Sequence, residues 1–239
     1  MFYQAVIFDL FGTLVDNYPL QETHAILSEI AQVLDVSPQE FIFLWTIETW
    51  HQRSSGAFPC LEASMEHMCQ LLQRRVIPGC IQRACQIWLD STRQTLIPRD
   101  KTLDMLQTLR LSGYKIGIMT DCSHETPFHW PTTPFPSCVD ATVFSCLAGM
   151  KKPDLRMYNL TCQHLSVQPE RCIYIGDGCG HELTGAARAG MYPIHLLIPW
   201  KESSDSLRPD AEEWQGATLS SLEQVLSFIE NLNSVVMEI

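Results

Sequence analysis

The sequence predicts an α/β protein in which a doubly wound parallel sheet carries an inserted α-helical domain. Three observations predict this class. Short apolar runs bounded by polar or glycine residues recur along the chain and are typical of buried strands. Helical patterns separate the later runs, and such alternation favours a parallel sheet. Between the first and second runs, residues 20–96 show only helical spacing.

The first predicted strand covers residues 4–8, and its apolar run ends directly before Asp9. A turn containing Gly12 follows, so Asp9 lies between a buried strand and a tight change of direction. A carboxylate at the carboxyl end of a strand points into the crevice where open α/β sheets bind ligands. It can act there as a nucleophile or as a metal ligand.

The stretch that follows is predicted to be a helical cap over this crevice. Apolar residues recur at helical spacing, as at Ile26, Ile30 and Val33, and Ser37 with Glu40 forms a capping box. Its aromatic residues are interpreted mainly as cap core, with contact to a substrate as the alternative; they are Phe41, Phe43, Trp45 and Trp50. We expect residues 17–96 to form the cap and residues 1–16 and 97–239 to form the core domain.

The remaining strands are expected at 115–119, 140–144, 172–175 and 193–197. Leucines from Leu103 to Leu111 predict a helix before the second strand, and Leu155, Tyr158 and Leu165 predict another. A third helix ends near Gly190, which is a suitable C-cap. The polar segment 201–215 is expected to be a surface loop before a final helix at 219–232.

Composition excludes several classes of protein. The net charge of −11 argues against a nucleic acid or an anionic membrane as partner. No apolar stretch is long enough to span a bilayer, and the first residues lack the basic segment of a signal peptide. The ten cysteines form no CxxC pair, which favours reduced thiols. We therefore expect a cytoplasmic protein; the oligomeric state stays open.

Four polar clusters lie at predicted strand ends or helix starts. They are Asp9 to Thr13, Thr120-Asp121, Lys151 to Asp154, and Gly176 to Glu182. Because carboxyl ends of parallel strands meet at one rim of a sheet, all four clusters can converge there.

This ordered set, with a helical insert after the first cluster, resembles the haloacid dehalogenase (HAD) superfamily. The resemblance covers the chain from about Asp9 to Gly190 and is closest to the phosphatase-like branch with a C1-type helical cap. It implies a Rossmann-like core and Mg²⁺-dependent hydrolysis of a small phosphorylated metabolite.

The resemblance also implies residue roles. Asp9 would be the nucleophile that forms an aspartyl-phosphate, Thr13 would order its loop, Thr120 would bind a phosphoryl oxygen, and Lys152 would neutralise charge. Mg²⁺ would be held by Asp9, Asp177 and the main-chain carbonyl of Phe11, with Glu182 in the outer shell. The substrate site would include Phe11, Gly12, Asp121 and, from the cap, Arg53.

Elementary electrostatics supports this division of roles. Attack of a carboxylate on a phosphate dianion brings like charges together, and a dication with an ammonium offsets that repulsion in a partly dry cleft. Oxygen ligands favour Mg²⁺ over Zn²⁺.

Phe11 departs from the phosphatase pattern, in which an aspartate protonates the leaving group and later activates water. General acid–base assistance contributes ~10²–10⁴-fold. Three outcomes are compatible with Phe11: a substrate with a low-pKa leaving group such as an acyl or aryl phosphate, a proton from a cap residue such as His51, or slow turnover.

Two further functions stay open. One is a 2-haloacid dehalogenase, since halide leaves without a proton and Arg53 could serve as the cap arginine of such enzymes. Gly176-Asp177 retains the metal-binding form, which favours phosphoryl chemistry. The other is a catalytically impaired protein that only binds anions.

Overall fold

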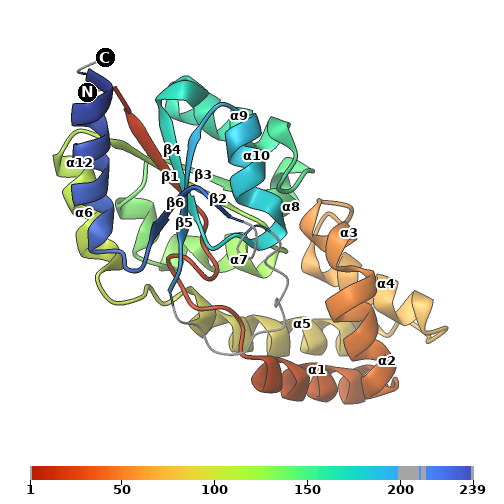
Figure 1. Ribbon diagram of the computed structural model, residues 1–239. Coiled ribbons are helices and arrows are strands. Elements are labelled where there is room, and N and C mark those ends of the chain that lie inside the picture. Colours follow the sequence, from red (N-terminus) through yellow and green to blue (C-terminus); the bar gives the residue numbers. More distant parts are fainter. Residues whose placement is uncertain (1, 199–209, 211–213, 238–239) are drawn as a thin grey trace.

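The computed structural model describes residues 2–198, 210 and 214–237. Among these residues, six strands form one sheet in the order β3-β2-β1-β4-β5-β6, and every neighbouring pair is parallel (Figure 1). The strands are β1 (Ala5–Phe8), β2 (Lys115–Thr120), β3 (Ala141–Phe144), β4 (Cys172–Gly176), β5 (Tyr192–Leu196) and β6 (Ala217–Leu219). The predicted α/β class with a helical insert after the first strand is confirmed.

Strand β1 lies between β2 and β4, so the chain order reverses at this strand. Phe8 is in register with Ile118 on one side and with Ile175 on the other. The segments that follow the three strands therefore emerge at one rim, at the position where sheets of this kind bind ligands. This register brings Asp9, Thr120 and Asp177 to a common edge.

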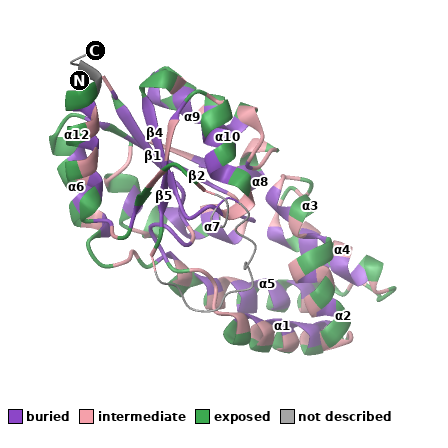
Figure 2. Cartoon of the chain, in the orientation of Figure 1, coloured by how far each residue is buried: buried purple, intermediate pink, exposed green. Residues whose placement is uncertain are grey.

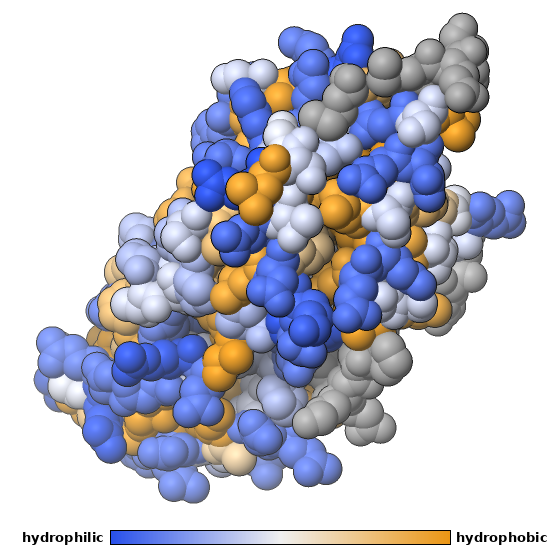
Figure 3. All heavy atoms as spheres, turned by 90° about the vertical axis from the view of Figure 1, so that its left-hand side faces the viewer, coloured by the Kyte–Doolittle hydropathy of each residue, from blue (hydrophilic) through white to orange (hydrophobic). Residues whose placement is uncertain are grey.

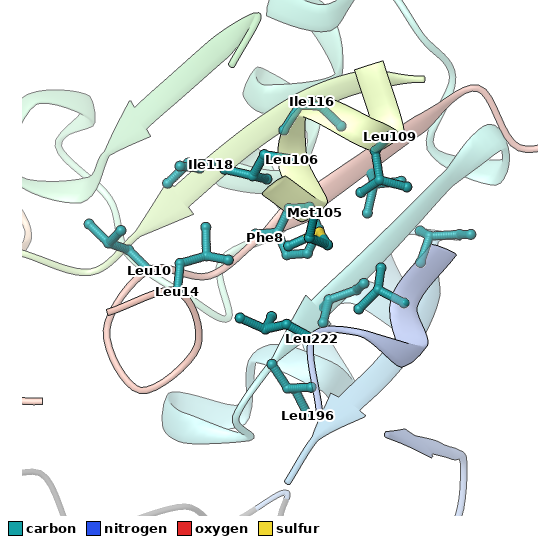
Figure 4. Packing of buried hydrophobic residues seen from close by; sticks show 14 of the residues in the cluster. Phe8, Leu10, Leu14, Met105, Leu106, Leu109, Ile116, Ile118, Leu196 and Leu222 are labelled. Carbon is teal, nitrogen blue, oxygen red and sulfur yellow. The ribbon is translucent and has the colours of Figure 1, made fainter. Parts of the chain in front are cut away.

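Helices cover both faces of the sheet (Figure 1). Helices α6 (Thr102–Leu111) and α12 (Gln224–Met237) pack on one face, while α9 (Leu155–Leu165) and α10 (Glu182–Arg188) pack on the other. Successive strand residues point to opposite faces, so Phe8 joins Met105 and Leu106 in the first core layer, and Ile7 joins the second (Figure 4). Burial on both faces explains why the strands read as continuous apolar runs (Figure 2).

The insert between β1 and β2 is helical and has a hydrophobic core of its own. Its elements are α1 (Leu20–Leu34), α2 (Pro38–Phe43), a π-helical turn (Leu44–Glu48), α3 (Trp50–Ser54), α4 (Leu61–Leu71) and α5 (Pro78–Thr92). Leu27, Met65 and Trp88 belong to one buried cluster that these helices share. As expected, the Ser37 hydroxyl accepts the amide of Glu40 at the start of α2. The domain limits at residues 16/17 and 96/97 stay a prediction.

Two details at the carboxyl-terminal end differ from expectation. Strand β6 was not expected, because three residues at a sheet edge give too short a pattern. The last helix begins at Gln224 rather than at residue 219, since Ala217–Leu219 pairs with β5. Of the expected loop 201–215, residues 201–209 and 211–213 lie outside the described residues.

Two further α-helices are short and lie at the rim of the sheet: α7 (Glu125–His129) and α8 (Ser145–Ala148). No helix in the described part of the chain is both long and apolar enough to cross a membrane. On the side of the molecule that carries α6 and α12, apolar side chains lie in small groups among hydrophilic ones (Figure 3).

Candidate active site

The centre of the site is a buried ammonium held between two carboxylates. Lys152 Nζ lies 2.5 Å from Asp9 Oδ1 and 2.6 Å from Glu182 Oε2. The three residues come from the segment after β1, the segment before α9 and the first turn of α10. All three are almost fully buried. Asp9 and Lys152, which are 143 positions apart in the chain, thus form an ion pair. The sequence predicted that these two residues would lie at the same rim.

Burial and charge act against each other in this cluster. Burial raises the pKa of Asp9, the Lys152 ammonium opposes the rise, and the Asp177 carboxylate adds to it. Burial also raises the pKa of Glu182 in spite of Lys152. Burial alone would lower the pKa of Lys152, but Asp9 and Glu182 outweigh it and raise that pKa well above its usual value. Lys152 therefore stays protonated, while burial makes Asp9 and Glu182 harder to ionise than exposed carboxyl groups.

Short local contacts hold the nucleophile candidate and the lysine in place. The Thr13 hydroxyl donates to Asp9 Oδ2 at 3.1 Å and so links the loop after β1 to the Asp9 carboxylate. The Lys152 amide donates to Asp121 Oδ1 at 3.0 Å, which ties the segment before α9 to the segment after β2. Asp154 caps α9 by accepting the amide of Arg156.

Gly12 is required at its position for two reasons. Its φ of +83° lies in the left-handed region, and a Cβ placed on it would lie 2.0 Å from Asp177 Oδ2. The Asp177 carboxylate therefore packs directly on the main chain of the loop after β1. Because Gly12 has no side chain, Asp177, which directly follows β4, can lie close to Asp9.

We expect Gly12→Ala to lower Mg²⁺ affinity at least tenfold and to cost about 1 kcal/mol of stability from the left-handed backbone. Gly149→Ala is the matched control, because Gly149 has φ of +70° and open space where its Cβ would be. Isothermal titration with Mg²⁺ and thermal unfolding check both variants. Equal loss of Mg²⁺ affinity in the two would show that backbone strain, not displacement of Asp177, causes the defect.

Thr120 supplies an unused hydrogen-bond donor. It is the last residue of β2, fully buried, and its Oγ1 has no hydrogen-bond partner among the described residues. Buried hydroxyls without partners are uncommon because desolvation costs free energy that only a hydrogen bond returns. The expected role of Thr120, donation to an oxygen of a bound anion, fits this observation.

The carboxylates at this rim fit a divalent metal ion. Asp9, Asp177 and Glu182 each offer an oxygen atom, and these atoms lie within 4.8 Å of one another. Both Glu182 oxygens already accept bonds, from the Gly178 amide and from Lys152 with the Tyr174 hydroxyl. Glu182 is thereby better suited to the outer shell, and Asp9 with Asp177 to direct contact with an oxygen-preferring ion.

A pocket between the cap and the rim adjoins this cluster. It encloses about 120 Å³, and its lining residues include Phe11, Tyr18, Trp45, Trp50, Arg53, Trp88, Asp121 and Glu125. The volume suits a ligand of few heavy atoms, since pockets for drug-sized molecules begin near ~300 Å³. Asp121 lines the pocket and also accepts the Lys152 amide, so the pocket adjoins the acidic cluster.

Arg53 is the cation of this pocket and is buried. Its Nη1 donates to Ser123 Oγ at 3.1 Å and its Nη2 to the Trp45 carbonyl at 2.5 Å, whereas Nε has no partner among the described residues. The guanidinium lies 3.9 Å from the centre of the Trp45 ring. Burial lowers its pKa to about 10, which leaves it charged at neutral pH.

Several residues of the site were not predicted from the sequence, among them Tyr18, Ser123, Glu125 and Tyr174. Tyr174 lies in an apolar strand run and resembles a core residue, and Tyr18 carries no motif. Ser123 and Glu125 read as ordinary helix-start residues, although their position just after Thr120-Asp121 was a usable signal. His51, considered as a proton donor, is exposed and does not line the pocket. Phe43 is 51% exposed, so it is not core, whereas Trp50 lines the pocket.

Comparisons with known proteins place these features in a family. The model for haloacid dehalogenase-like hydrolases matches residues 3–190. A glyceraldehyde 3-phosphate phosphatase of Methanocaldococcus jannaschii is 25% identical over 57% of this chain and 58% of its own length. The chain thus spans little more than half of that relative. An (S)-2-haloacid dehalogenase of Pseudomonas putida is 23% identical over 73% of this chain and 76% of the dehalogenase.

Solved structures share the fold at low sequence identity. A HAD phosphatase from Thermococcus onnurineus superimposes with a TM-score of 0.66 and 19% identity, covering 95% of this chain and 97% of that one. A HAD family enzyme from Bacteroides thetaiotaomicron, crystallised with magnesium and inorganic phosphate, gives a TM-score of 0.57 and 15% identity over 81% of this chain and 94% of that one.

Proposed function

The chain belongs to the haloacid dehalogenase-like hydrolases, and we propose that it is a Mg²⁺-dependent phosphatase of small phosphorylated metabolites that works through a phosphorylated Asp9. The observation that carries the proposal is the contact of Lys152 Nζ with Asp9 Oδ1 at the rim where β2 ends in Thr120, whose hydroxyl has no partner among the described residues. A nucleophilic carboxylate, an ammonium and a hydroxyl donor at one rim are the groups that transfer of a phosphoryl group requires. The phosphatase relative and the magnesium–phosphate complex of the Bacteroides enzyme lend support.

The proposed reaction has two displacements at phosphorus. Asp9 attacks the phosphorus, the bond from phosphorus to the leaving oxygen breaks, and that oxygen departs with the electron pair. Water then attacks the phosphorus of the aspartyl-phosphate, the bond to Asp9 breaks, and inorganic phosphate leaves. The sum is phosphate ester and water giving alcohol and phosphate, with Asp9 restored.

Each polar side chain has a distinct task in these steps. Lys152 neutralises charge on Asp9 and on the phosphoryl oxygens, and Glu182 with Tyr174 holds the ammonium in position. Thr120 donates to a phosphoryl oxygen. Asp9, Asp177 and the carbonyl of Phe11 would hold Mg²⁺, with Glu182 behind them. The ion would lower the repulsion between the carboxylate and the phosphate dianion.

Phe11 limits which esters can react. Its ring supplies no proton to the leaving oxygen and no base to the water, so the leaving group must depart as an anion. Arg53 also lines the pocket, and its buried Nε has no hydrogen-bond partner among the described residues.

Assay of phosphate release from acetyl phosphate, with Mg²⁺ and with EDTA, tests the proposed function. We expect release that EDTA lowers at least ~10²-fold, because the dication offsets several kcal/mol of charge repulsion. Halide release from 2-chloropropionate that resists EDTA would instead identify a dehalogenase. Binding of phosphate analogues without any turnover would identify an anion-binding protein.

A further inference from the structure

The wall of the pocket between the cap and the rim is aromatic. The Phe11 ring lies 5.3 Å from the Tyr18 ring, and Tyr18 stacks on Trp88 at 6.2 Å with their planes 6° apart. Trp88 in turn contacts Trp45 edge-on at 5.3 Å. The stack begins at Phe11, in the loop that carries Asp9, and ends at Trp45 inside the cap.

Polar residues also line the pocket, among them Asn17, Thr23, Thr46 and Thr126, and they can bond hydroxyl groups of a leaving group. Against the rings of Phe11, Tyr18 and Trp50, however, a desolvated hydroxyl group gains no partner. Flat rings, by contrast, gain from offset or edge-on contacts with other rings. The enclosed volume of about 120 Å³ suits one ring rather than a long apolar chain.

The charges of the pocket also favour an uncharged ring. The Arg53 guanidinium is linked through Ser123 to Glu125, whose Oε2 accepts the Ser123 hydroxyl at 2.6 Å. Glu125 is buried too and offsets the charge of Arg53. A second phosphate or carboxylate on the substrate would therefore lie beside a neutral Arg53–Glu125 pair and would gain little attraction from it.

The missing acid at position 11 leads independently to the same class of substrate. Without a proton donor, the leaving oxygen must carry its negative charge away, and an aryl oxide spreads that charge over its ring while an alkoxide cannot. Phe11, which stands where the acid would be, is also the first ring of the aromatic stack.

We propose that this pocket selects the aryl phosphates, that is, monophosphate esters of small phenol-like compounds. The inference rests on the proposed phosphatase function and names its substrate class. The ring stacks against Phe11 and Tyr18 under Trp50, and it departs as an aryl oxide that takes its proton from water.

Phosphonates test the ring preference without turnover, because their phosphorus–carbon bond is not hydrolysed. Phenylphosphonate, cyclohexylphosphonate and methylphosphonate are titrated in Mg²⁺ while the protein's tryptophan fluorescence is followed. We expect phenylphosphonate to bind at least about tenfold more tightly than cyclohexylphosphonate, which is of similar size but not flat, and more tightly still than methylphosphonate.

Two variants test whether the preference for a flat ring arises in this pocket. Tyr18→Leu and Trp50→Leu are each expected to remove most of the advantage of phenylphosphonate and to leave methylphosphonate binding unchanged. Phe43→Leu, an exposed cap aromatic outside the pocket, is expected to change neither.

Equal affinity for the phenyl and cyclohexyl compounds would overturn the proposal, even if acetyl phosphate, which has no ring, is hydrolysed. A ring preference that the Tyr18 and Trp50 variants both retain would also overturn it, because the ring would then bind elsewhere. Failure to hydrolyse acetyl phosphate and phenyl phosphate alike, with the ring preference intact, would overturn the phosphatase function and leave the ring-binding pocket.

Discussion

Replacing Asp9 by Asn is expected to lower phosphate release by about 10⁴-fold or more and to leave the fold intact. An amide cannot form the phosphoryl-enzyme intermediate, so the covalent route is lost entirely. Stability should change by only about 1 kcal/mol, because Lys152 keeps Glu182 as a partner at 2.6 Å. Steady-state rates and thermal unfolding of the purified variant measure both quantities.

Asp154→Asn is the matched control for this change. Asp154 caps α9 from outside the acidic cluster, and an asparagine caps a helix about as well. The control should retain full activity. Activity of Asp9→Asn close to that of the unaltered protein would remove Asp9 from the role of nucleophile.

Replacing Phe11 by Asp is expected to raise the rate on alkyl phosphates by about 10²-fold. The new carboxyl group would supply the proton that an alkoxide needs as it leaves, and later a base for the attacking water. The rate on aryl phosphates should gain far less, because their leaving oxygen departs without a proton and the ring contact with Tyr18 is lost. Parallel assays of propyl phosphate and phenyl phosphate give the two rates.

Phe11→Asn separates acid–base chemistry from the loss of the ring. It removes the same aromatic contact and adds a side chain of similar size to Asp that cannot exchange a proton in this role. It should therefore leave the alkyl rate unchanged. An equal gain in both variants, or no gain in a folded Phe11→Asp protein that still binds Mg²⁺, would contradict the role assigned to position 11.

Most strands of the sheet could be predicted from the local sequence, because a strand that is buried on both faces is a continuous run of apolar residues. Ala5–Phe8 and Cys172–Gly176 are buried throughout and were found within one residue of their limits. Ala217–Leu219 gave no usable signal, since an edge strand of three residues is specified by its partner β5 rather than by its own sequence.

The acidic cluster was foreseeable for a different reason. Its members follow strand ends, and parallel topology brings strand ends together, so Asp9, Lys152 and Asp177 could be grouped without coordinates. The wall of the pocket could not, because the ring contact between Phe11 and Tyr18 depends on how the cap rests on the core. Local sequence pattern specifies elements, but not the docking of one helical layer on another.

The role of Asp9 as nucleophile is tested most directly by identifying the residue that is phosphorylated during turnover. Protein mixed with Mg²⁺ and acetyl phosphate is quenched within milliseconds, the acyl phosphate is reduced with borohydride, and the peptides are mapped by mass spectrometry. A phosphorylated Asp9 gives homoserine at position 9 and nowhere else, and we expect none in Asp9→Asn. Steady phosphate release with Asp9 unmodified, or with reduction at another carboxylate, would contradict that role.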